Sequence, residues 1–280
     1  MRTPAWARHL KQSTMKTILF LIAVMALSCA TVHAADIVCL TSEDPHNYDA
    51  VTFLNGFADQ ELRPLGHQVK VIAGNQPKPT HFEGLLSAMP DADLLIVFVR
   101  RATPPRAELD VVRGHLQAGK PMIGIRTANH GFIPSPNDPP PPSGCAAWPD
   151  FSPEVLGCQN AGYQTQGLPY RVGLLPTTPQ DDPLLEGVDV ASIRGHQSLY
   201  RVLPLAKNVR PLLFGTPQNR EPPQPVAWTR TYGDSHARIF YTSLGAPQDF
   251  VQPAVRRLLV NAVNWTLDEP SGQTTGRSDQ

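Results

Sequence analysis

Residues 98–132 read FVRRATPPRAELDVVRGHLQAGKPMIGIRTANHGF, and this stretch decides the fold. The apolar run Ala92–Val99, which ends just inside it, predicts a buried strand, and Pro121–Ile125 predicts a second one. A helix is predicted between them by apolar residues at helical spacing: Leu109, Val112 and Leu116. Two parallel strands joined by a helix place residues 126–130 at a carboxyl end of the sheet, where ligands of open α/β sheets bind.

The same alternation extends toward the amino terminus. Asp36–Leu40 and Val69–Ala73 predict strands. Between them, residues 51–65 carry apolar side chains at helical spacing and stop at Gly66, a residue that often ends helices. The pattern predicts an α/β protein with a doubly wound, mostly parallel sheet in a flavodoxin-like three-layer arrangement.

The carboxyl-terminal half is less regular. Strands are predicted at Tyr200–Leu203, Val226–Thr229 and Arg238–Thr242, the last two joined by a hairpin turn. A closing helix is predicted to start at Pro253. Prolines cluster at residues 134–142 and 222–225 and predict long, stiff loops. The polar tail 270–280 is predicted to be disordered.

The first 34 residues have the pattern of a signal peptide. Lys16 precedes an apolar run over residues 17–30, and small residues at Val32 and Ala34 predict cleavage after Ala34. The run is too short for a membrane span, so we expect an exported protein, periplasmic or secreted, with one domain over residues 35–269. An alternative is lipid anchoring at Cys29, within Ala-Leu-Ser-Cys.

Charge content limits the classes of possible partner, and the cysteines raise the question of a disulfide. The chain has 24 basic and 24 acidic residues, and the expected cleavage removes four basic residues and no acidic one. The resulting acidic excess argues against nucleic acid as a partner. Cys39 lies in a predicted strand and is expected to be inert. In an oxidising compartment Cys145 and Cys158 either form a disulfide or stay free.

Several segments, taken together and in order, resemble the ThuA-like family, whose name refers to trehalose utilisation. They are VRRATPP with GKPMIGIRTANHGF, FSPEVLGCQNAGYQ, HQSLYRV and the region from PVAWTRTYGDSHARIFYTSLG to NWTL. The resemblance covers nearly the whole mature chain. It implies the fold of class I glutamine amidotransferases and a role in carbohydrate metabolism.

The resemblance also excludes one reaction. Glutamine amidotransferases carry a nucleophilic Cys in a Gly-Ile-Cys-x-Gly type turn after the corresponding strand, whereas this chain reads Gly-Ile-Arg-Thr-Ala at residues 124–128. The guanidinium of Arg126 cannot form a thioester. Glutamine hydrolysis by the usual Cys–His route is therefore excluded at this turn.

Three residues are candidates for catalysis. His130 titrates near neutral pH, as a general acid or base must, and Glu43 is the first choice for a carboxylate that shares this work. Arg126 would stabilise negative charge on a substrate oxygen. Structural roles compete with each of these: an ion pair of Arg126 with Glu43 or Asp44, and a helix cap or loop hydrogen bond for His130.

Other polar and aromatic residues are candidates for substrate binding. They are Arg100, Arg101, Thr127, Asn129, His196 and Tyr200. Trp148 and Tyr163 are placed in loops, where they could stack on a sugar ring, whereas Trp228 and Tyr241 fit buried strands. His46, His130 and His196 lack the spacing of known metal sites, so no metal and no cofactor are predicted.

We therefore expect an exported ThuA-like protein that binds or transforms a sugar or keto-sugar derivative in the crevice at the strand ends. If it is an enzyme, proton transfer next to a carbonyl or at a glycosidic bond is expected. The alternatives are a non-catalytic binding or interaction domain, which the missing thiol explains equally well, and a metal-assisted hydrolase.

Overall fold

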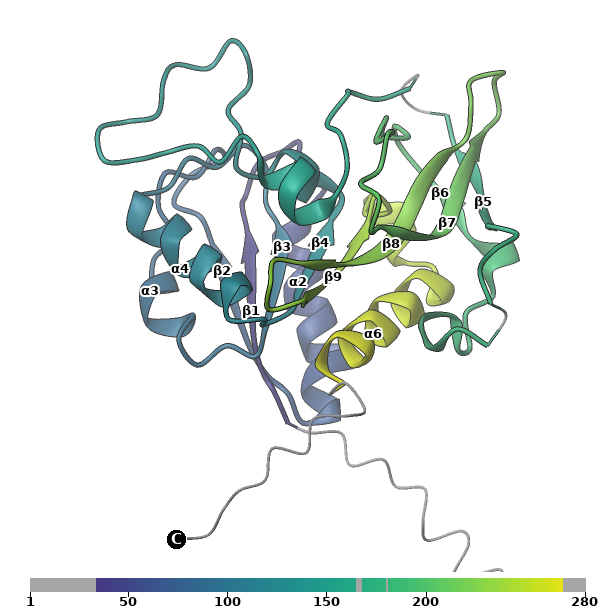
Figure 1. The fold of residues 1–280 in the computed structure, drawn as a ribbon, viewed down its shortest axis with the longest axis horizontal. Helices are drawn as coiled ribbons and strands as arrows, with labels where there is room; N and C mark the ends of the chain where they lie inside the picture. Colours follow the sequence, from purple (N-terminus) through teal and green to yellow (C-terminus); the bar gives the residue numbers. More distant parts are fainter. Residues whose placement is uncertain (1–33, 165–167, 180, 269–280) are drawn as a thin grey trace, which may run out of the picture. The chain divides into compact units, whose positions relative to one another are not determined.

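A computed structural model describes residues 34–164, 168–179 and 181–268 of the chain. The expected signal peptide, apart from Ala34, and the polar tail lie outside the described residues. Within the described ranges, no helix is long and apolar enough to cross a membrane. The described part is built on one central sheet (Figure 1).

The sheet has nine strands in the order β2-β1-β3-β4-β9-β8-β7-β5-β6. The first five are parallel: β2 (Gln68–Ala73), β1 (Asp36–Thr41), β3 (Leu94–Phe98), β4 (Met122–Ile125) and β9 (Ala237–Thr242). From β9 onward neighbours are antiparallel: β8 (Gln224–Tyr232), β7 (Arg210–Pro217), β5 (Tyr170–Leu174) and β6 (Arg194–Gly195). The mostly parallel half therefore confirms the predicted fold class, and an antiparallel extension is added to it.

Helices cover both faces of the parallel half (Figure 1). On one face lie α2 (Ala50–Phe57), which continues as a π turn (Ala58–Leu62) and a 3-10 turn (Arg63–Leu65), and α6 (Pro253–Leu267). On the other face lie α3 (Leu85–Ala88), α4 (Arg106–Gln117) and the π turn Phe151–Leu156. Successive side chains of a strand enter opposite cores, as in β3, where Ile96 packs with α2 and Val97 with α4.

Short turns complete the chain and shape the ends of the strands. A 3-10 turn at Arg126–His130 follows β4 directly, and the four-residue helix α5 (Pro247–Phe250) follows β9. Two further 3-10 turns lie between β5 and β6, at Pro183–Leu185 and Val190–Ser192. Gly66 has a φ of 96° and ends the first helical segment, as the sequence indicates.

Some predictions for the carboxyl-terminal half are wrong. Residues 201–203 are not a strand, and Tyr200 forms only an isolated bridge to Tyr163. Pro225 lies inside β8, opposite Phe214, close to an irregularity in the β7–β8 register where the strand tolerates the missing N–H. The strands β5 and β7 were not predicted, because their exposed Arg and Pro residues hide the apolar pattern.

The described cysteines are free thiols. Cys39 and Cys158 are buried, and burial raises the pKa of each thiol to about 12. Cys145 is half-buried, with its Sγ 3.6 Å from the carbonyl oxygen of Thr80. The Cys145–Cys158 disulfide, one of two possibilities left by the sequence, is therefore not formed in this structure.

The packing of α6 against the sheet gives a stability prediction. Val263 is fully buried, whereas Val251, just before the helix, is 78% exposed. Replacing Val263 by Ala removes buried methyl groups and leaves a small cavity, so we expect a loss of about 2 kcal/mol in the free energy of unfolding. The matched change Val251→Ala should cost less than about 0.5 kcal/mol. Urea unfolding measures both, and equal midpoints for the two variants would contradict this account of the core.

Candidate functional site

The candidate site lies at the carboxyl ends of three adjacent parallel strands. β1, β3 and β4 are neighbours in the sheet, so the loops that follow them meet at one edge. A cavity of about 330 Å³ opens there. It is lined by His46 and Tyr48 after β1, Arg100 and Arg101 after β3, Asn129 and His130 after β4, Asn160, Gly162 and Tyr163 after the Phe151–Leu156 turn, and Ser198 and Tyr200 after β6.

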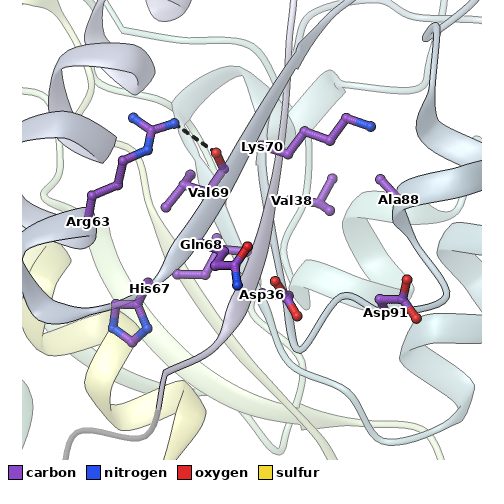
Figure 2. A pocket seen from close by; sticks show the side chains of 10 residues that line it. Asp36, Val38, Arg63, His67, Gln68, Val69, Lys70, Ala88 and Asp91 are labelled. Atoms are coloured by element: carbon purple, nitrogen blue, oxygen red, sulfur yellow. Dashed lines mark hydrogen bonds between the residues drawn. The ribbon is translucent and has the colours of Figure 1, made fainter.

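A larger hollow, of about 600 Å³, lies along the edge strand β2 (Figure 2). It is bordered by the first residues of two strands, Asp36 of β1 and Gln68 of β2. Arg63, which also lines it, donates to the carbonyl oxygen of Val69 at 2.8 Å. Because ligands of open α/β sheets bind at the carboxyl ends of strands, position favours the smaller cavity as the functional site.

Arg126 directly follows β4, and it is completely buried. Its Nη1 donates to the carbonyl oxygen of Ser243 at 2.7 Å, and its Nη2 donates to the carbonyl oxygen of Ser198 at 3.1 Å. The guanidinium lies between two rings, with Cζ 4.2 Å from the centroid of Tyr48 and 4.8 Å from that of Tyr200. Arg126 is therefore held behind the cavity wall by carbonyls and aromatic faces.

The expected ion pair of Arg126 with Glu43 or Asp44 is wrong. Asp44 instead accepts a hydrogen bond from Nη1 of Arg100 at 2.6 Å. Glu43 is exposed and does not line the cavity. Of the three residues expected to form a catalytic group, His130 lines the cavity and Glu43 and Arg126 do not.

The backbone of Arg126 has a conformation that is rare for a non-glycine residue. Its φ is 42°, in the left-handed region that non-glycine residues rarely adopt. Tyr48 and Arg101, which line the cavity, have φ values of 57° and 56°, and Gln197, beside Ser198, has 62°. Strained residues of this kind cluster at functional sites, because the surrounding structure must hold them in place.

His130 lines the cavity and its ring lies 5.8 Å from that of Tyr200, centroid to centroid. Burial, together with the positive charges of Arg101, Arg100 and Arg126, holds the pKa of His130 well below its usual value of 6.5. The imidazole is therefore neutral at pH 7. It is suited to accept a hydrogen bond, and as a base it is weak.

Two other candidates have structural hydrogen bonds. Thr127 Oγ1 donates to Oδ1 of Asn47, whose own Nδ2 donates to the carbonyl oxygen of Phe98 at 2.9 Å. Asn129 Nδ2 donates to the carbonyl oxygen of Gln159 at 3.0 Å. Thr127 is buried and closes the turn, whereas Asn129 both fixes a loop and lines the cavity.

His196 does not line the cavity. Its Nδ1 lies 2.9 Å from Oδ1 of Asp249, which is fully buried and also accepts hydrogen bonds from the N–H groups of Gly245 and Ala246. The pair joins the β6 region to α5. Sequence analysis missed Asp249, although an acidic residue two positions after Pro247 at a helix start is a recognisable signal.

The aromatic residues are divided between the core and the cavity lining, and this division differs in part from the expectation. Trp228 and Tyr241 are buried in the core, as predicted. Trp148 is wrong as a sugar-stacking candidate, because it is 5% exposed and packs beside Phe132 and Phe151. Tyr163 is 50% exposed and lines the cavity, and Tyr48, which sequence analysis did not select, lines it as well.

The alternative of a metal-assisted hydrolase needs a set of metal ligands. Within residues 34–164, 168–179 and 181–268, no three His, Cys, Asp or Glu side chains gather closely enough to hold a metal ion. His196 is engaged by Asp249, and His46 and His130 come from different strand ends. The grouping of His46, His130 and His196 as metal ligands is therefore wrong.

The charges around His130 give a titration prediction. Arg101 is the charged neighbour that contributes most to the lowered pKa of His130, so Arg101→Gln should raise this pKa toward 6.5. Arg106→Gln removes an equal charge from an exposed position outside the cavity and should leave the pKa of His130 unchanged. Titration of the imidazole signals by NMR measures both variants. An identical His130 titration in the two would show that the arginines do not set its protonation.

A family model described as "ThuA: Trehalose utilisation" matches residues 67–266. No curated protein matches the chain. Solved structures do. A ThuA-like protein from Parabacteroides merdae is 16% identical, with a TM-score of 0.61, and the alignment covers 88% of this chain and 93% of that one. A ThuA-like protein from Bacteroides uniformis is also 16% identical, with a TM-score of 0.56 and coverage of 84% and 92%.

Because their sequence identity to this chain is low, these structures show a shared fold alone. The family match extends over most of the chain and includes the turn that carries Arg126, Asn129 and His130. It also includes the strands that follow in the antiparallel half. The chain belongs to the ThuA family.

Proposed function

We propose that this protein binds a sugar or keto-sugar derivative in the cavity at the ends of β1, β3 and β4, without a covalent nucleophile. One observation carries the proposal: in a family described by trehalose utilisation, a cavity of ligand size opens at the carboxyl ends of the parallel strands. Its lining combines hydrogen-bonding side chains with the exposed ring of Tyr163. Sugars are commonly bound by such a mixture of polar groups and aromatic faces.

Binding is better supported than turnover. The residue at the elbow is a buried guanidinium, and the hydroxyl of Thr127 is hydrogen-bonded to Asn47. If a reaction occurs, His130 is the group in the cavity that can exchange a proton with a ligand, because it is neutral at pH 7 and lies beside Tyr200. The missing nucleophile and the absence of Glu43 from the cavity lining favour a second candidate, a non-catalytic binding domain.

A ligand panel tests the sugar site. A carbohydrate present at about 100 times its dissociation constant should stabilise the folded full-length protein by about 2.7 kcal/mol, which raises the melting temperature by roughly 5–11 °C. We expect such a shift with at least one member of a panel of disaccharides, keto-disaccharides and sugar acids, measured by thermal unfolding.

Two variants show where the ligand binds. Tyr163→Ala should remove the shift, whereas Tyr232→Ala, which replaces a tyrosine outside the cavity lining, should preserve it. Absence of any shift across the panel, or a shift that survives Tyr163→Ala and His130→Ala alike, would refute a carbohydrate site in this cavity.

Export is the second part of the proposal. The described fold begins at Ala34, and β1 begins at Asp36, so cleavage after Ala34 removes no described helix or strand. The N–H of Ala35 donates to Nδ1 of His67 at 3.3 Å, and this contact of the first residue after the expected cleavage point supports the proposal.

Expression in a bacterial host with an intact export pathway tests the processing. We expect the mature protein to start at Ala35 when its amino terminus is sequenced and its mass is measured. A protein that starts at Cys29 and carries the added mass of a lipid would establish the anchored alternative. An unprocessed chain in the cytoplasm would overturn export.

A further inference from the structure

The positive charges at the cavity are only partly balanced by acidic side chains. Arg100 has a partner in Asp44. Arg101 donates to the carbonyl oxygens of Ile133 and Pro134, at 3.1 and 3.3 Å. Carbonyl oxygens carry no formal charge. In the part of the chain that the structure describes, no carboxylate pairs with Arg101.

Arg126 adds a second unbalanced charge directly behind the cavity wall. Its hydrogen-bond acceptors are two carbonyl oxygens and the hydroxyl of Tyr48. The nearby carboxylate of Asp249 is engaged by His196 and by backbone N–H groups. Burying a cation without a counterion is costly, and the rings of Tyr48 and Tyr200 compensate only part of that cost.

The guanidinium groups also have unused hydrogen-bonding capacity. The Nε atoms of Arg101 and Arg126 are both buried and have no hydrogen-bond partner among the described residues. Arg100 uses Nη1 for Asp44, and its side chain remains 20% exposed at the cavity. No Asp or Glu is among the described residues that line the cavity. The cavity therefore offers donors and positive charge. Asp44 neutralises Arg100, whereas Arg101 and Arg126 have no ion-pair partner among the described residues.

His130 shows the direction in which this charge acts inside the cavity, although burial is the larger cause of its lowered pKa. The three arginines, together with burial, oppose protonation of its imidazole. The same positive potential that disfavours a further cation stabilises an anion placed at this position. An anion bound there would compensate Arg101 and Arg126 at the same time.

We propose that the cavity binds an oxyanion group, so that the ligand is an acidic sugar derivative, a sugar acid or a sugar phosphate, rather than a neutral sugar. Arg101 and Arg100 contact the oxyanion, Arg126 stabilises it from behind the wall, and Tyr163 packs against the sugar ring. The anionic part of this proposal rests on the arginines alone. The sugar part rests on the proposed function.

Matched ligands test the charge. We would titrate the full-length protein by calorimetry with glucose, glucuronate and glucose 6-phosphate, which share one ring, and with the pair trehalose and trehalose 6-phosphate. Acetate and inorganic phosphate serve as anions without a sugar. At least one acidic sugar should bind about tenfold more tightly than its neutral counterpart, the effect of one or two charge-assisted hydrogen bonds. Glucuronate and the phosphates identify which oxyanion is preferred.

Matched variants locate the anion. Arg101→Gln should weaken binding of the acidic sugar about tenfold and leave that of the neutral sugar unchanged, and Arg101→Lys should retain most of the affinity. Arg106→Gln, an equal loss of charge outside the cavity, should change neither. Raising the salt concentration should weaken the acidic ligand selectively. The NMR titration of His130 is an independent readout, because a bound anion raises its pKa.

The outcomes separate the two proposals. Equal affinity for neutral and acidic sugars, insensitive to Arg101→Gln, would overturn the oxyanion site and leave the sugar site standing. Acetate or phosphate binding as tightly as the acidic sugars, with no effect of Tyr163→Ala, would establish an anion site and overturn the sugar. Absence of binding by every ligand would refute both.

Discussion

Both faces of the parallel half of the sheet are covered by helices, and this constraint determines where polar groups can lie. A side chain on β1, β3 or β4 enters an apolar core whichever way it points, so these strands carry almost no polar residues. Charged and hydroxyl groups appear only at the ends of these strands. The register of the three strands then brings those ends together, and the cavity is a direct consequence of burial on two sides.

This constraint explains which parts of the fold can be predicted from sequence. Runs such as Leu94–Phe98 are apolar throughout because both faces are buried, and the helices between strands carry clear apolar stripes. The antiparallel strands are half-exposed, so β5 and β7 mix Arg, Pro and Gly with apolar residues and give no clear pattern. At Tyr200–Leu203 the apolar spacing predicted a strand that is not present, because Tyr200 and Val202 pack into the core from an irregular segment.

The site was predictable in its location and less so in its assembly. Loops after parallel strands converge whatever their sequence, and Arg100, Arg101, Asn129, His130 and Tyr200 do line the cavity. The direction of each side chain depends on local backbone angles that a sequence does not reveal. Neighbouring Glu43 and Asp44 illustrate this point, since only Asp44 turns inward to pair with Arg100. Burial of Arg126 behind Tyr48 required a left-handed residue at 48, which few tyrosines adopt.

The surroundings of Arg126 have a consequence for how this branch of the fold can change. Replacing Arg126 by Cys would not be enough to create the reactive turn of an amidotransferase. The smaller side chain would leave the carbonyl oxygens of Ser198 and Ser243 without their donor and leave Tyr48 and Tyr200 facing an empty volume. Several positions would have to change together before a thiol there became useful. The packing around Arg126 therefore opposes a thiol at this position, and new activities are more accessible through the loops that surround the cavity.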